Sequence, residues 1–176
     1  MSEFTNALVS KERSVKIPEE FDYFGQFAGE WDFEWIDNHN TDKERHVKGE
    51  WIFSWILEGT AIQDLFICPS RDERIKNPQT DSEYGTTIRI YNPKKQAWDI
   101  FYGCSGETTL LEATKENDTI VLTCLNINDE NLRMKWVFSD ITEISFHWRN
   151  LMSSDCGDTW NVCGELFEIR KRACQK

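Results

Sequence analysis

Several polar side chains that can do chemistry lie inside segments rich in aromatic residues. His147 is flanked by Phe146 and Trp148, and a neutral imidazole there can act as a general base or bind haem iron. Glu112 and Glu165 also lie in apolar segments, where burial would raise a carboxyl pKa and suit it to proton transfer. We therefore take His147, Glu112 and Glu165 as candidate catalytic residues, with a structural or surface histidine as the alternative for His147.

A second set of polar residues can hold a ligand. Arg89 and Tyr91 lie two residues apart and so share one face of a strand, where a guanidinium can bind a carboxylate through two hydrogen bonds. An outward Arg89 paired with a surface acid is the alternative. Gln63 and Asp64 fall on opposite strand faces, and the alternation leaves open which of them points inward. The candidate ligand-binding residues are Trp51, Phe53, Trp55, Gln63, Arg89, Tyr91, Trp98, Tyr102, Trp136, His147 and Arg149.

The segment 49–69 predicts the element around which the others are organised. Trp51, Phe53 and Trp55 alternate with smaller or more polar residues, which is the period of a strand. Residues 57–59 predict a turn, and residues 60–67 a returning strand. A hairpin with two indoles and a phenyl ring on one face needs an enclosed apolar interior.

Further strands predict how that interior closes. About ten strands are expected, joined mostly by short turns and with hardly any helix. Because aromatic residues recur on one face of strand after strand, we predict an all-β fold, a closed antiparallel up-and-down β-barrel. The long polar segment 68–84 is expected to form a lid over the barrel.

The N-terminal region divides into two parts. Residues 1–17 are polar and predict a flexible arm, and residues 18–176 a single barrel domain. Pro18 followed by two acids predicts the start of a short helix whose Phe21, Phe24 and Phe27 would plug one end of the barrel.

Charge and cysteine content limit the partners. The formal net charge of −11 argues against nucleic acid and anionic membranes, and no run approaches the roughly 20 apolar residues of a membrane span. No signal peptide is visible, and the six cysteines are dispersed without metal-ligand spacing, so we expect reduced thiols in the cytoplasm. The expected partner is a small hydrophobic or aromatic molecule, and the sequence leaves a homodimer open.

Two motifs carry a resemblance to a known superfamily. Phe24-x-x-Phe27-x-Gly29-x-Trp31 resembles the opening of lipocalin-type (calycin) barrels, and Arg170 is similar to the basic residue that covers the opening Trp in that superfamily. A wider pattern, from Trp55-Ile56-Leu57-Glu58-Gly59 to Phe146-x-Trp148-Arg149, is similar to an uncharacterised bacterial lipocalin-like branch. The resemblance implies the fold, whereas such barrels serve as carriers, haem proteins and enzymes alike.

A third motif lies near the C-terminus. Ser153-x-Asp155-x-Gly157-x-Thr159-Trp160 resembles the Asp-box, a hairpin loop in which the Asp bonds backbone amides. Sialidases carry several copies on propellers, but this chain has one copy and no propeller repeat. The resemblance therefore implies a rigid turn between the last two strands and no glycosidase chemistry.

Three functions follow from these features. The leading hypothesis is that a small, largely apolar or aromatic ligand binds inside the barrel. The first alternative is a cofactor-independent isomerase, cyclase or lyase that acts in the same cavity through His147 or a buried Glu. The second is a haem protein similar to nitrobindin-like barrels, which bind haem through one His; otherwise no cofactor is expected.

Overall fold

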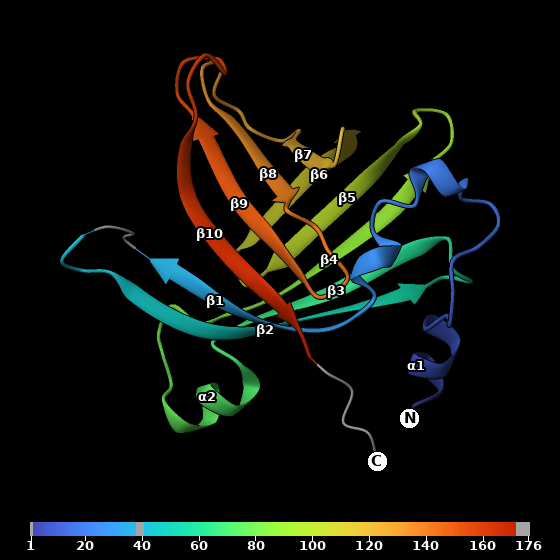
Figure 1. Cartoon of the computed structure of the whole chain (residues 1–176), viewed down its shortest axis with the longest axis horizontal. Helices are drawn as coiled ribbons and strands as arrows, with labels where there is room; N and C mark the ends of the chain where they lie inside the picture. Colours follow the sequence, from blue (N-terminus) through green and yellow to red (C-terminus); the bar gives the residue numbers. More distant parts are fainter. Residues whose placement is uncertain (1, 38–40, 172–176) are drawn as a thin grey trace.

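The computed structural model describes residues 2–37 and 41–171, and in it ten antiparallel strands close into a barrel (Figure 1). Each strand pairs with its neighbours in sequence, and β1 pairs with β10 to close the sheet. The strands are β1 (Gly29–Asp37), β2 (Arg45–Ile56), β3 (Ala61–Cys68), β4 (Glu83–Asn92), β5 (Ala97–Cys104), β6 (Glu107–Glu116), β7 (Thr119–Cys124), β8 (Arg133–Ser139), β9 (Ser145–Ser153) and β10 (Asn161–Arg170). The predicted fold class is confirmed.

Helix contributes little to the described ranges. The α-helices are α1 (Glu3–Leu8) and α2 (Arg71–Lys76), and neither they nor any other helix in residues 2–37 and 41–171 is long and apolar enough to cross a membrane. The single helix expected from Pro18 onward is instead two 3₁₀ turns, Glu19–Phe21 and Gly25–Phe27. Asp22 separates them, because its backbone (φ −76°, ψ 67°) leaves the helical region.

These two turns fill one end of the barrel with aromatic rings. Phe24 and Phe27 are fully buried, and Phe27 packs against Phe146 with ring centroids 4.7 Å apart. The indole of Trp31 donates a 2.7 Å hydrogen bond to the carbonyl of Phe27. Arg170 covers the outer side of Trp31, with its guanidinium carbon 4.2 Å from the ring centroid, as the resemblance implied. We call this end of the barrel the closed end.

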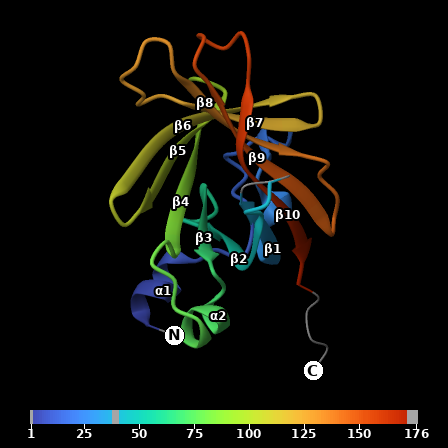
Figure 2. The same ribbon diagram turned by 90° about the vertical axis from the view of Figure 1, so that its left-hand side faces the viewer.

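The N-terminal residues run along the β2–β3 hairpin beside the closed end. The amides of Ser10 and Ser14 donate to the carbonyls of Trp55 and Gly59 at 2.8 and 2.9 Å, and Ile17 is buried. Figure 2 shows α1 and this segment beside the barrel wall. The flexibility expected of residues 1–17 stays a prediction, although Ser10, Ser14 and Ile17 make these contacts with the barrel or are buried.

The Asp-box segment forms a compact turn between β9 and β10. Asp155 accepts a 2.9 Å hydrogen bond from the amide of Thr159 and a 2.5 Å bond from its hydroxyl, while the Ser153 hydroxyl accepts from the amide of Gly157 at 2.9 Å. The Ser153 hydroxyl also donates to Asp155 at 2.6 Å, and this bond, followed by the two from Thr159, lowers the pKa of Asp155 to about 2. The motif therefore has a structural role in the turn.

Candidate functional site

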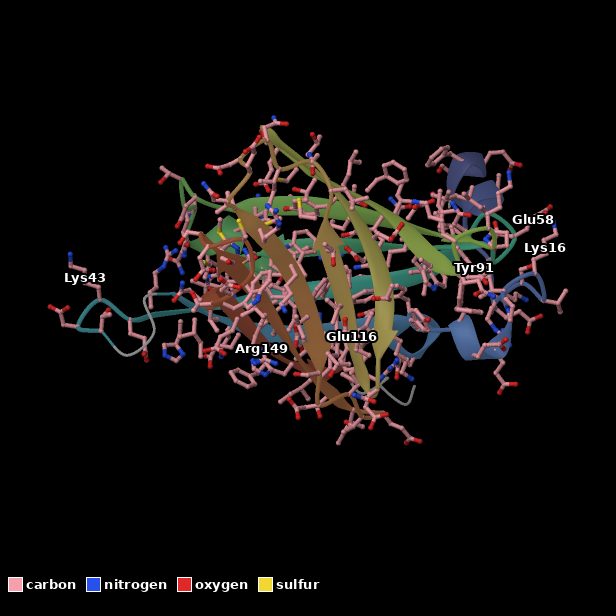
Figure 3. The ribbon with its side chains drawn as sticks, turned by 90° about the horizontal axis from the view of Figure 1, so that it is seen from above. Lys16, Lys43, Glu58, Tyr91, Glu116 and Arg149 are labelled. Atoms are coloured by element: carbon pink, nitrogen blue, oxygen red, sulfur yellow. The ribbon has the colours of Figure 1, made fainter. Side chains whose placement is uncertain are left out.

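A cavity of about 150 Å³ lies toward the end of the barrel opposite the 3₁₀ turns, which we call the open end. Figure 3 shows the two ends: Tyr91 lies with Lys16 and Glu58 at the closed end, and Lys43 marks the hairpin at the open end. The cavity is lined by Trp35, Trp51, Phe66, Glu83, Thr87, Tyr102, Glu107, Trp136, Trp148 and Asn150. Alternation along the strands places these side chains on the inner face, as it does the buried Phe146 next to Trp148.

Three buried indole N–H groups in this wall have no hydrogen-bond acceptor among the described residues: those of Trp51, Trp136 and Trp148. The side-chain carbonyl oxygen of Asn150 is buried there too and has no donor among the described residues. Trp51 and Trp148 are only 4 % and 8 % exposed. A buried donor without an acceptor costs about 1–3 kcal/mol, so the wall favours an occupant that can accept hydrogen bonds.

The opposite wall carries a carboxyl and a phenol in contact. Tyr102 on β5 donates a short hydrogen bond to Glu83 on β4. Burial raises the pKa of both groups. At Glu83 the hydrogen bond from Tyr102 acts against this rise, and the nearby Glu107 adds to it. Glu107 is exposed at the rim, where it accepts a 3.2 Å bond from the Thr109 hydroxyl. This pair is the group in the cavity best suited to proton transfer.

A second, more polar pocket of about 180 Å³ shares Trp35, Phe66 and Glu83 with the cavity and forms its mouth. Arg45 and Asp81, which also line it, form a 2.6 Å ion pair. The segment between β3 and β4 therefore borders the entrance, with α2 seen beneath the barrel in Figure 1. Its action as a lid stays a prediction.

Of the predicted ligand-binding residues, Trp51, Tyr102 and Trp136 line the cavity. Four others face the interior nearer the closed end and pack with the plug: Phe53, Trp55, Tyr91 and Trp98. The indole of Trp98, for example, donates to the carbonyl of Phe21 at 2.9 Å. Sequence alternation gives the inward face but not the depth along the barrel axis.

Arg89 also faces inward, but it is bound to the protein. It forms an ion pair with Asp64, and both side chains are completely buried. Its guanidinium carbon lies 4.9 Å from the ring centroid of Phe24, on the closed-end side. Arg89 and Tyr91 are not among the described residues that line the cavity, so their joint binding of a ligand carboxylate stays a prediction. The choice left open between Gln63 and Asp64 falls to Asp64. Gln63 lies on the outer face and donates to the Thr86 hydroxyl at 3.0 Å.

The three candidate catalytic residues lie on the outer face. His147 contacts Glu165 at 3.1 Å and stacks on Phe167, since its neighbours Phe146 and Trp148 take the inward positions. Glu112 pairs with Lys95 at 2.8 Å on the outside of β6. Arg149, expected to bind ligand, also points outward, where it donates to the Ser139 hydroxyl at 3.4 Å. None of these four can reach the cavity.

The same orientation decides against haem bound through His147. The other described histidine, His46, lies on the outer face of β2 between Glu34 and Glu44, with which it makes contacts of 3.2 and 2.9 Å. His39 lies outside the described residues. The residues that the structure describes therefore do not fit the haem alternative.

Sequence reasoning missed most of the polar lining. The residues that it did not assign to the site are Trp35, Phe66, Glu83, Thr87, Glu107, Trp148 and Asn150. Trp148 and Asn150 follow Phe146 at intervals of two residues, so strand alternation predicts that they point inward if Phe146 does. Glu83 and Glu107 are the first residues of β4 and β6. An acidic residue next to a turn is common, so no local signal identifies these two as cavity residues.

Comparison with known proteins supports the fold. No known protein family matches the chain, and no curated protein matches its sequence. Among solved structures, Rv2717c from M. tuberculosis is similar with a TM-score of 0.58 and 12 % identity, over 89 % of this chain and 99 % of that one. The S-type phycobiliprotein lyase CpeS from Guillardia theta is similar with a TM-score of 0.57 and 10 % identity, over 86 % and 92 %. At these identities the two structures support the fold of the chain, which is the closed ten-stranded barrel.

Proposed function

We propose that the protein binds a small, largely apolar or aromatic molecule in the cavity at the open end. The observation that carries this proposal is the set of buried indole N–H groups in the cavity wall that have no partner among the described residues. Aromatic walls supply the apolar contact, and the N–H groups select an occupant that has at least one hydrogen-bond acceptor. The proposal agrees with the leading hypothesis from the sequence, and its residues overlap the predicted set at Trp51, Tyr102 and Trp136.

The volume limits the size of the occupant. An engineered cavity of about 150 Å³ in another protein binds benzene, so this cavity suits a molecule of about one ring. The adjoining mouth leaves room for a polar substituent near Arg45 and Asp81. Haem and other large ring systems exceed this space.

Titration with benzyl alcohol, a single-ring acceptor, tests the proposal through tryptophan emission and calorimetry. The cavity-filling variant Thr87→Phe is expected to lose binding at least about tenfold, which corresponds to about 1.4 kcal/mol. Thr108→Phe adds the same ring on the outer face of β6, two strands away from β4, and is expected to leave binding unchanged. Equal binding by folded Thr87→Phe and wild type would remove the cavity as the site.

A second candidate function is proton transfer in the same cavity, as in an isomerase, cyclase or lyase. The burial of Glu83 beside the Tyr102 phenol favours it, because burial keeps the Glu83 pKa above its usual value even though the hydrogen bond from Tyr102 acts in the opposite direction. The similarity in fold to a lyase gives further, weaker support, since one fold hosts many activities.

Turnover of a ligand found by native mass spectrometry would test this second function. The Glu83→Gln protein is expected to bind that ligand and to convert it at least about a hundredfold more slowly. The His147→Ala protein is the matched control and is expected to retain full activity, because His147 faces outward. Full activity of Glu83→Gln would exclude Glu83 as the acid or base.

A further inference from the structure

The polar groups that the cavity presents to an occupant are acidic or neutral. Glu83 lies in its wall and Glu107 at its rim, and no Lys, Arg or His is among the described residues that line it. Arg89 lies two residues beyond Thr87 on the inner face of β4, but its charge is bound to Asp64. Among the described residues that line the cavity, an anionic occupant would therefore meet carboxyl groups and no positively charged side chain.

The aromatic walls favour a positive charge as well. The rings of Trp136 and Trp148 lie 5.7 Å apart at 60°, and those of Tyr102 and Trp136 lie 5.3 Å apart at 83°. These three rings are inclined to one another instead of stacked, and all three line the cavity. The faces of such rings carry negative potential and attract ammonium groups, in the way that aromatic cages recognise quaternary amines.

We propose that the occupant is a small organic cation, a molecule of about one ring that carries an ammonium group. This inference rests on the proposed binding function and names its ligand class. The ammonium group lies between the aromatic faces and the Glu83 carboxyl, with the free side-chain carbonyl oxygen of Asn150 as a further acceptor. The unpartnered indoles of Trp51 and Trp148, both more than nine-tenths buried, then bond an oxygen elsewhere on the same molecule.

This ligand class differs from the one that the sequence pattern suggested. An Arg-x-Tyr pair predicted a carboxylate ligand, and that prediction required a free guanidinium in the cavity. The ion pair between Asp64 and Arg89 neutralises that group near the closed end. The carboxyl groups among the described lining residues are those of Glu83 and Glu107, and neither is paired with Arg89.

Three probes that keep a phenol oxygen as acceptor and differ mainly in charge test the inference: 3-hydroxybenzylammonium, 3-hydroxybenzyl alcohol and 3-hydroxybenzoate, each titrated against the full chain at neutral pH and low salt. Wild-type protein is expected to bind the cationic probe at least about tenfold more tightly than the neutral one, and the anionic probe least tightly. Equal affinity for the cationic and neutral probes, or tighter binding of the anionic probe, overturns the cation assignment and leaves the binding function in place. Failure of all three probes to bind overturns both.

Two variants place the charge preference in the cavity. Glu83→Gln is expected to bind the cationic probe with an affinity within about threefold of its own affinity for the neutral probe. Should Glu83→Gln not fold, as checked by thermal unfolding, Glu107→Gln at the exposed rim is expected to lower the preference in part. Glu112→Gln, an acid on the outer face of β6, is the control and is expected to keep it. A preference unchanged in both cavity variants overturns the inference.

Discussion

Asp64 on β3 and Arg89 on β4 form an ion pair that is completely enclosed by the barrel. Asp64 pairs in register with Thr87, so the two charged side chains extend diagonally across the inner face of neighbouring strands. The second carboxyl oxygen of Asp64 and the Nε and Nη2 atoms of Arg89 have no partner among the described residues. The rings of Phe24 and Phe53, at 4.9 and 5.3 Å from the guanidinium carbon, supply the remaining favourable contact.

Removal of one partner from this pair is expected to be strongly destabilising. Asp64→Asn leaves the Arg89 charge buried without a counter-ion and is expected to lower the free energy of unfolding by about 3–5 kcal/mol, measured by urea denaturation. The double variant Asp64→Leu with Arg89→Met removes both charges and is expected to recover most of that loss.

A surface pair provides the matched control for this prediction. Asp99→Asn breaks the 2.7 Å contact with Lys95 on the outside of β5 and is expected to cost less than about 1 kcal/mol. A cost for Asp64→Asn as small as that of Asp99→Asn would show that the buried pair contributes no more than an exposed one.

The same two residues show how far the sequence predicts this fold. Alternation of aromatic residues predicted the closed barrel, because a strand with rings on one face must bury that face. It left Gln63 and Asp64 open because β3 is apolar on both faces. Ala61 and Ile67 on its outer face are as completely buried as Ile62 on its inner face, since the N-terminal segment and α2 lie against this hairpin. Residues distant in sequence bury the outer face of β3, and the local alternation of side chains carries no information about such contacts.

The candidate site was less predictable for a related reason. The sequence correctly predicted that His147 lies on the strand face opposite to Phe146 and Trp148, but it did not show which of the two faces points inward. The structure shows that the two aromatic rings are enclosed, so His147 points outward. The cavity exists because the 3₁₀ turns fill the closed end and leave the open end partly empty, which is a property of the whole barrel. Strand periodicity does not contain that information.

Arg170 is predicted to stabilise the closed end. Its guanidinium stacks on Trp31 and donates to the carbonyls of Ala28 and Gln26 at 2.9 and 2.5 Å, so it joins the end of β10 to the chain entering β1. Arg170→Met keeps much of the apolar contact but removes these bonds, and we expect a loss of about 2 kcal/mol in the free energy of unfolding.

Thermal and urea unfolding of Arg170→Met, followed through tryptophan emission, would measure this loss. Lys94→Met, on the exposed β4–β5 turn, removes a cation without such contacts and is expected to change stability by less than about 0.5 kcal/mol. If the two variants unfold at the same urea concentration, the cover over Trp31 is not a stabilising contact.

Glu168 is predicted to make the protein less stable as the pH rises. It points into the barrel between Phe33 and Phe146, is 1 % exposed, and neither carboxyl oxygen has a partner in the described part of the chain. Burial therefore raises its pKa well above the ordinary value of 4.5. Between pH 4.5 and the raised pKa the native state holds a proton that the unfolded state has lost, so the free energy of unfolding falls with rising pH.

Replacement of Glu168 by Gln removes the titrating proton and keeps the shape of the side chain. We expect Glu168→Gln to be more stable than wild type at pH 7 by about 1–3 kcal/mol, and the difference to vanish as the pH falls toward 4. Other carboxyl groups titrate in both proteins, so the difference between the two urea-denaturation curves at each pH isolates this residue. Glu116→Gln, an exposed acid on β6 marked in Figure 3, is the control and should give a small, nearly pH-independent difference. A Glu168→Gln curve parallel to that of wild type from pH 4 to pH 8 would mean that Glu168 does not hold its proton in the native barrel.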